Sequence, residues 1–256
     1  MTESPIYPDL RDASVFITGG GSGIGADITR RFLEQGSKVA FVQRSDASAY
    51  VDEMEAATGN RPHFMQCDIT DIPRLKACVA EASERHGTIT VMVNNAANDE
   101  RHKTLDVEEA YWDRMIAINL KSYFFGCQAV IPGMQAAGGG SIINFSSISY
   151  MMGMGDYQIY TASNSGINAM SRGLAREFGA DKIRVNALAP GWVLTERQKD
   201  LWVTEESLEA HLKRQCLKDT MEPADVADGV LFLASNASKM MTGQSLVIDG
   251  GVVVTG

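Results

Sequence analysis

The stretch SVFITGGGSGIG, residues 14–25, joins an apolar run to a cluster of glycines that opens a helical pattern. Glycine lets the backbone turn sharply and come close to a phosphate group. The free N–H groups and the dipole at the start of the following helix then favour an anion. The sequence therefore predicts a nucleotide site at this turn, and the residues expected to contact the nucleotide are Gly19, Ser22, Gly23, Ile24 and Gly25.

Short β-rich runs alternate with longer helical patterns along the whole chain, which is typical of a parallel sheet with crossover helices. The expected strands are Ser14–Thr18, Lys38–Val42, His63–Cys67, Thr90–Asn94, Ser141–Phe145, Arg184–Leu188 and Ser245–Ile248. The expected helices are Ile24–Gln35, Ala47–Ala57, Ile72–Arg85, Glu108–Met134, Tyr157–Phe178 and Pro223–Ala234. The sequence thus predicts one α/β domain over residues 1–256, a doubly wound (Rossmann) parallel seven-stranded sheet with helices on both faces.

The segment Gly191–Asp219 breaks this alternation, because it is charged, aromatic and only weakly helical. It follows an expected strand at the edge where open α/β sheets bind ligands. We expect a substrate lid over residues 191–219; the alternative is an ordinary surface insertion.

The amino-acid composition and charge exclude several classes of protein and of partner. Hydrophobic residues make up 45% and charged residues 21% of the 256, as in folded globular proteins. The net charge of −9, without a basic run, argues against nucleic-acid and anionic-membrane partners. We see no spanning apolar stretch and no secretory signal. Four cysteines without CxxC or CxxH spacing favour a reducing cytoplasm and predict no metal site: Cys67, Cys78, Cys127 and Cys216.

Several motifs together resemble the short-chain dehydrogenase/reductase family over nearly the whole chain. They are TGGGSGIG at 18–25, Asp68, NNAA at 94–97, Asn119, Ser147, Tyr160, and Pro190-Gly191 with Thr195. The resemblance implies that Asp68 and Ile69 hold the adenine of a nicotinamide cofactor and that Asn95 supports the sheet edge beside it. It also implies that Pro190, Gly191, Val193 and Thr195 lie at the nicotinamide and pyrophosphate. Ala97 departs from the family's glycine at this position.

The end of the second expected strand bears on the choice between NAD and NADP. A carboxylate there would bind the ribose 2′-OH of NAD, whereas a cation would bind the 2′-phosphate of NADP. The chain has Gln43 in the acid's place and Arg44 next to it, and Arg44 can pair with a phosphate. The sequence therefore favours NADP; the alternative is that Arg44 is solvated or stacks on adenine and that NAD binds too.

The resemblance also assigns the chemistry. Tyr160 would be the general acid/base, Ser147 would hydrogen-bond the substrate oxygen, and Asn119 would hold a water in a proton relay. The family has a lysine four residues after the tyrosine, on the same helix face. This lysine would lower the phenol's pKa from about 10 and also bind the nicotinamide ribose.

Asn164 stands in the lysine's place and brings no positive charge. It can still donate a hydrogen bond to a ribose hydroxyl. Two explanations are open: an engineered substitution that traps bound ligand, or a natural residue in a slow enzyme or in a non-catalytic nicotinamide-binding regulator. In either case we expect weak or absent turnover.

Polar and aromatic side chains gather after the fourth, fifth and sixth expected strands, which suits a polyhydroxylated substrate better than an apolar one. The residues expected to bind it are Asn98, Arg101, Ser149, Met154, Gln158, Trp192 and Gln198. The runs NNAANDERH, FSSISY and PGWVLTERQ resemble the sugar (aldose) 1-dehydrogenase branch, which oxidises an anomeric hydroxyl to a lactone. Arg101, Gln198 and Lys199 could also accept an anionic sugar. Another secondary alcohol is an alternative substrate, a solvated polar loop is the alternative for 98–102, and a homotetramer is expected by analogy.

Overall fold

The computed structural model describes residues 5–254, and its centre is a single parallel sheet. The strands are β1 (Ser14–Thr18), β2 (Lys38–Gln43), β3 (His63–Gln66), β4 (Val91–Asn94), β5 (Gly140–Phe145), β6 (Ile183–Pro190) and β7 (Ser245–Ile248). Their order is β3-β2-β1-β4-β5-β6-β7, which confirms the predicted doubly wound seven-stranded sheet. The order reverses between β1 and β4, and open α/β sheets bind ligands at the carboxyl ends of strands beside such a switch point.

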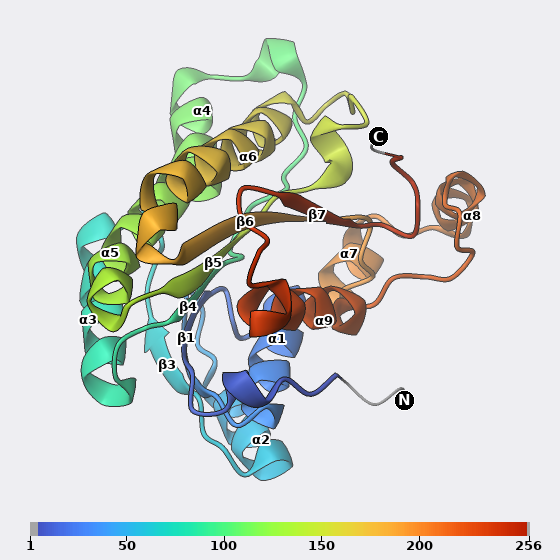
Figure 1. Cartoon of the computed structure of the whole chain (residues 1–256). Coiled ribbons are helices and arrows are strands. Elements are labelled where there is room, and N and C mark those ends of the chain that lie inside the picture. Colours follow the sequence, from blue (N-terminus) through green and yellow to red (C-terminus); the bar gives the residue numbers. More distant parts are fainter. Residues whose placement is uncertain (1–4, 255–256) are drawn as a thin grey trace.

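Helices cover both faces of the sheet, as predicted (Figure 1). One face carries α1 (Gly23–Glu34), α2 (Ser48–Thr58) and α9 (Pro223–Ala234). The other carries α3 (Ile72–His86), α5 (Ser122–Ala137) and α6 (Gln158–Phe178). Successive strand residues point to opposite faces, so Val15 and Ile17 belong to one apolar core and Phe16 to the other. Burial of both strand faces explains the continuous apolar runs in the sequence.

The helix expected over residues 108–134 is interrupted. The chain forms α4 (Glu109–Ile116), then a wide π-helical turn at Ala117–Lys121, and then α5. The side chain of Asn119, within the wide turn, donates to the carbonyl oxygen of Asn98 at 3.0 Å. This bond fastens the irregular turn to the segment after β4. A continuous apolar pattern in the sequence does not distinguish the wider turn from regular helix.

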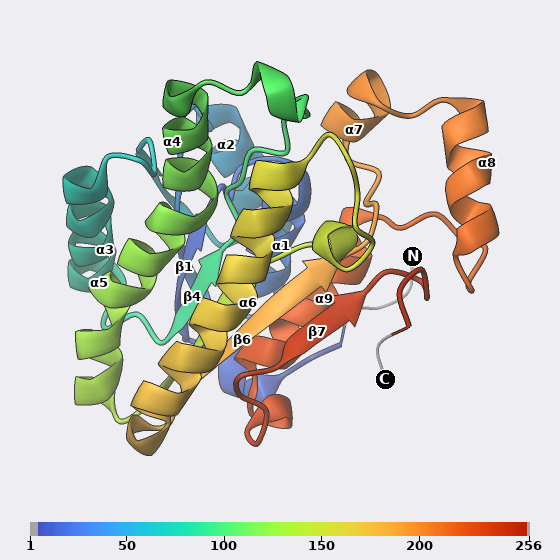
Figure 2. The same cartoon turned by 90° about the horizontal axis from the view of Figure 1, so that it is seen from above.

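The segment 191–219, called the lid segment below, contains two helices rather than weak helical structure. They are α7 (Glu196–Leu201) and α8 (Glu205–Arg214), and Figure 2 shows both beyond the carboxyl ends of β6 and β7. The hydroxyl of Thr195 accepts from the N–H of Gln198 and so caps α7, while Thr204 and Ser207 form a capping box on α8. Within residues 5–254, no helix combines the length and apolar character needed to cross a membrane.

Candidate active site

A cavity of about 1110 Å³ opens at the carboxyl ends of the central strands. The glycine turn, the segments after β4 and β5, the start of α6 and the lid segment form its walls. Most predicted site residues line it: Gly19, Ser22, Gly23, Ile24, Gly25, Asn95, Arg101, Asn119, Ser147, Ser149, Met154, Tyr160, Asn164, Pro190, Gly191, Trp192, Val193, Thr195 and Gln198. The structure thus brings together residues that are up to 179 positions apart, from Gly19 to Gln198.

Five predicted residues lie elsewhere. Arg44, Asp68 and Asn98 line a neighbouring hollow of about 520 Å³. Ile69 is buried in the apolar core, and Gln158 is exposed at the start of α6, where its Oε1 accepts from the N–H of Tyr157. Gln158 therefore does not belong to the cavity wall. Its position between Ser147 and Tyr160 in the sequence did not reveal that its side chain lies outside the cavity.

The glycine turn has the backbone geometry expected for a phosphate cradle. Gly19 and Gly23 have φ values of 71° and 53°, which disfavour residues with a side chain. A Cβ on Gly25 would lie 1.9 Å from the carbonyl oxygen of Gly19. Ser22, the residue before α1, makes no side-chain cap bond, so no side chain competes for the N–H groups at the helix start. This open helix terminus fits the pyrophosphate of a dinucleotide.

The end of β2 is held against the glycine turn by Gln43. Its Oε1 accepts from the N–H of Gly21 at 3.1 Å, and its Nε2 donates to the carbonyl oxygen of Ser45 at 3.2 Å. Gln43 is therefore engaged in shaping the turn. The side chain next to it, Arg44, faces the neighbouring hollow.

Asp68 shares that hollow with Arg44. Hydrogen bonds from Thr70, supported by the guanidinium of Arg44, hold the pKa of Asp68 below its usual range. The hollow thus holds an ionised carboxylate and a guanidinium beside the switch point of the sheet. Both groups suit the adenosine end of a dinucleotide.

Asn95 and the end of β6 complete the cofactor side of the cavity. The Nδ2 of Asn95 donates to the carbonyl oxygens of Thr18 at 3.1 Å and Gly19 at 3.2 Å, which ties the glycine turn to the end of β4. A Cβ on Gly191 would lie 2.9 Å from the Cα of Asp249, so only glycine fits there without a shift. The backbone then turns to place Val193 and Thr195 in the cavity wall.

Ser147 and Tyr160 reach the cavity from different elements. Ser147 follows β5, and its Oγ accepts from the N–H of Ser149 at 3.2 Å. Tyr160 lies in the first turn of α6, where the hydroxyl of Ser147 is near enough to its phenol to lower the phenol's pKa. Asn164, one turn further along α6, is 3% exposed and donates through Nδ2 to the main-chain oxygen of Tyr160 at 2.8 Å.

The surroundings of Tyr160 raise the pKa of its phenol rather than lower it. Burial raises the pKa of Tyr160 to about 12, and the carboxylate of Asp99 pushes it in the same direction. Hydrogen bonds with Asn164 and Ser147 and the charge of Arg197 lower the pKa by less. At neutral pH the phenol is therefore protonated.

Both polar atoms of the Asn119 side chain form hydrogen bonds within the protein. Its Oδ1 accepts from the N–H of Asn98 at 2.8 Å and its Nδ2 donates to the carbonyl oxygen of the same residue. Asn119 thus positions the segment after β4 beside the cavity.

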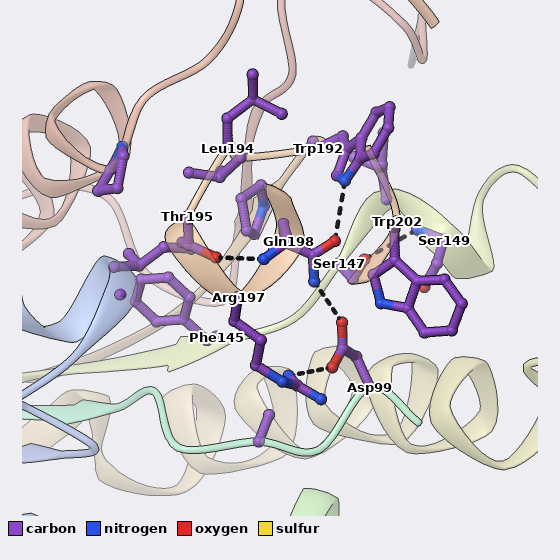
Figure 3. A pocket seen from close by; sticks show the side chains of 18 of the residues that line it. Asp99, Phe145, Ser147, Ser149, Trp192, Leu194, Thr195, Arg197, Gln198 and Trp202 are labelled. Carbon is purple, nitrogen blue, oxygen red and sulfur yellow. Dashed lines mark hydrogen bonds and ion pairs between the residues drawn. The ribbon is translucent and has the colours of Figure 1, made fainter. Parts of the chain in front are cut away.

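A chain of hydrogen bonds crosses the cavity between the segment after β4 and the lid segment (Figure 3). The carboxylate of Asp99 forms an ion pair with Arg197 and accepts from the Nε2 of Gln198 at 2.7 Å. The Oε1 of Gln198 accepts in turn from the indole nitrogen of Trp192 at 2.9 Å. Asp99 therefore ties α7 to the opposite wall.

Sequence reasoning missed several of the cavity's residues, namely Asp99, Tyr157, Arg197, Trp202, His211 and Arg214. Asp99 stands in a polar run already noticed in the sequence, and Arg197 stands in the lid segment. Their pairing joins positions 98 residues apart, which no local pattern displays. Among residues 5–254, no group of three or more histidine, cysteine or acidic side chains could hold a metal ion.

The sequence matches known proteins over almost its full length. A family model described as Enoyl-(Acyl carrier protein) reductase matches residues 19–253. The chain belongs to the short-chain dehydrogenase/reductase family. A solved short-chain type dehydrogenase/reductase from Mycobacterium ulcerans superposes with a TM-score of 0.90 at 28% identity, covering 94% of this chain and 90% of that one.

Two curated proteins are more similar to this chain in sequence than that solved structure is. A protein of Rhizobium meliloti (strain 1021) named probable galactose dehydrogenase is 46% identical over 96% of this chain and 97% of its own. The D-xylose 1-dehydrogenase of Caulobacter vibrioides (strain NA1000 / CB15N) is 45% identical over 97% of this chain and 98% of its own. Short-chain dehydrogenases are oxidoreductases that use NAD or NADP, and the glycine turn described above fits such a cofactor.

Proposed function

We propose that the protein is an NAD(P)-dependent sugar dehydrogenase that oxidises the anomeric hydroxyl of an aldose to a lactone. The convergence of Ser147 and Tyr160 on a cavity walled by hydrogen-bonding side chains carries this proposal. The names of the galactose and xylose dehydrogenases that it resembles support a sugar as the substrate.

Different residues bind the sugar, accept its proton and cover the cavity. The hydroxyl of Ser147 holds the sugar oxygen, and the phenol oxygen of Tyr160 takes the proton from it. The bound nicotinamide accepts the hydride that leaves the anomeric carbon. The lid segment, tied to Asp99 through Arg197 and Gln198, covers the sugar and excludes water.

Turnover in this chain is weak, because Asn164 supplies no cation to the tyrosine. A phenol whose pKa is about 12 exists almost wholly in its protonated form at neutral pH. Asn164 still offers an amide to the ribose of the cofactor. Arg44, at the end of β2 and without a carboxylate in the position of Gln43, favours NADP over NAD.

The proposal includes a homotetramer in the cytoplasm. Trp112 on α4 and Phe124 on α5 are 45% and 44% exposed, which is consistent with faces buried between subunits. Cys67, Cys78, Cys127 and Cys216 are all free thiols, which suits a reducing compartment.

The test follows nicotinamide reduction with a panel of aldoses, using the chain and its Asn164→Lys variant with NADP and with NAD. We expect a slow rate from the chain and a much faster rate from the variant on at least one aldose. A variant that binds dinucleotide but oxidises no aldose would refute the proposal and favour a non-catalytic regulator. Oxidation of other secondary alcohols alone would correct the substrate class.

A further inference from the structure

Two of the guanidinium groups that line the cavity have no ion-pair partner among residues 5–254. Arg197 is paired with Asp99, and Lys199 with Glu196 at 2.9 Å. Arg101 and Arg214 also line the cavity, and neither has a carboxylate within 4.0 Å among the residues that the structure describes. Two uncompensated guanidinium groups at the wall of an otherwise acidic protein point to an anionic ligand.

Arg101 is held in a fixed orientation by aromatic rings. Its guanidinium carbon lies 4.2 Å from the ring centre of Trp202 and 5.8 Å from that of Tyr157. Stacking occupies the face of the planar group and leaves the N–H donors along its edge pointing away from the rings. A stacked arginine of this kind is prepared to bind a carboxylate, sulfonate or phosphate through two parallel hydrogen bonds.

The position of Arg101 fits the far end of a sugar. The ring centres of Tyr157 and Tyr160 are 4.8 Å apart, so a single aromatic ring separates the phenol from the arginine. A hexose whose anomeric oxygen meets Tyr160 can extend its opposite end toward Arg101.

We propose that the substrate is an aldose carrying an anionic group at the carbon farthest from its anomeric centre, and that Arg101 binds this group. The inference rests on the proposed function and narrows its substrate class. The ion pair with Arg197 reduces the repulsion between Asp99 and the anion. Arg214 supplies a second positive charge on the α8 side of the cavity.

Binding, rather than turnover, is the primary test, because the chain turns over slowly. The protein loaded with reduced cofactor is titrated calorimetrically with galactose, galacturonate and galactose 6-phosphate, and with glucose and glucuronate. At low salt we expect one of the anions to bind at least about tenfold more tightly than its neutral parent. The preference should shrink as salt is added. The carboxylate and phosphate arms distinguish which anion is the natural one.

The Arg101→Gln variant keeps a polar side chain but removes the charge. The ratio of its affinity for the preferred anion to its affinity for the neutral parent should fall by about 10- to 100-fold. Arg85→Gln, on the exposed end of α3 and outside the cavity, is the matched control and should keep the preference. Equal affinities for anionic and neutral sugars, or an unchanged preference in Arg101→Gln, would overturn the inference.

The same experiment separates this inference from the proposed function. If the Asn164→Lys variant oxidises neutral aldoses and the protein binds no anionic sugar more tightly than its neutral parent, the proposed dehydrogenase activity is supported and the proposed anionic substrate is refuted. If an anionic aldose binds tightly through Arg101 but the same variant never oxidises it, the proposed anion site is supported and the proposed dehydrogenase activity is refuted.

Discussion

Asn164 donates a hydrogen bond from Nδ2 to the main-chain oxygen of Tyr160, 2.8 Å away, and thereby occupies the place one helical turn after the tyrosine with a neutral group. The amide is buried, so no solvent cation replaces the missing charge there. Burial raises the pKa of the phenol to about 12, and no cation beside it among the described residues lowers that value to the neutral range. The slow turnover proposed for this chain follows from that geometry.

The Asn164→Lys variant should restore a fast proton acceptor. A cation beside the phenol lowers its pKa by about 1–3 units, so the phenolate fraction near pH 7 rises by about 10- to 1000-fold. The rate of aldose oxidation, measured by reduced-cofactor absorbance, should rise in proportion. Asn164→Met, similar in length to lysine but uncharged, is the control for packing and should stay slow. Equal rates in the two variants would refute the electrostatic explanation.

The pH profile of the unmodified chain offers an independent test. Oxidation requires the deprotonated phenol, and below the pKa its fraction falls tenfold for each pH unit. Because that pKa is about 12, log kcat/KM for oxidation should climb with a slope near one from pH 6 to pH 10. The reverse reduction uses the protonated phenol and should be nearly flat over the same range. A plateau in the oxidation profile below pH 9 would identify a base other than Tyr160.

The fold was predictable because its signals are local. The glycines at 19–25 indicate one strand-turn-helix unit, and the apolar runs of β1 and β5 indicate buried strands. The wide turn at Ala117–Lys121 was not predictable, because a π-turn keeps the apolar composition of the helices around it. The bond between Asn119 and Asn98, which fastens it, forms only in the folded chain.

The candidate site was predictable only where a motif marks it. Ser147 and Tyr160 stand in recognisable surroundings, and both reach the cavity. Asp99 and Arg197 meet only because α7 folds back over the segment after β4, so their pairing is a tertiary contact without a sequence signal. The prediction that Gln158 binds substrate was wrong. Its polar side chain and its position between Ser147 and Tyr160 suggested a site residue, but Gln158 begins α6 with its side chain outside the cavity.

Gly25→Ala tests the glycine turn. A Cβ there would lie 1.9 Å from the carbonyl oxygen of Gly19, so the turn must shift. We expect a loss of about 1–3 kcal/mol in the free energy of unfolding and weaker dinucleotide binding. Gly173→Ala in α6 is the matched control, because nothing lies within 4 Å of its Cβ, and it should stabilise by about 0.5–1 kcal/mol. Chemical denaturation and calorimetry measure both effects; normal cofactor affinity in Gly25→Ala would contradict the phosphate cradle.

Arg44→Gln tests the proposed preference for NADP. Removing the guanidinium should weaken NADP binding by about 10- to 100-fold, as expected for a lost charged hydrogen bond. NAD binding should change by less than a factor of about two, because NAD has no 2′-phosphate. Fluorescence titration with both dinucleotides measures the two affinities, and Arg85→Gln is the control. A parallel loss of both affinities would mean that Arg44 contacts the adenine instead.

Asp99 and Arg197 form a pair whose two halves act oppositely on Tyr160, and this opposition allows a sharp test. The carboxylate raises the pKa of the phenol and the guanidinium lowers it. Asp99→Asn should therefore move the rise of oxidation activity to lower pH, whereas Arg197→Gln should move it to higher pH.

Both substitutions also break the ion pair between α7 and the segment after β4, so both should expose the lid segment to limited proteolysis to a similar degree. Comparing the variants thus separates charge from tethering, because only the charge effect changes sign. Measured pH profiles that shift in the same direction for both variants would show that the pair acts on catalysis through the position of the lid alone. Profiles that shift in opposite directions, with similar proteolysis, would establish that the pair sets the proton affinity of the phenol.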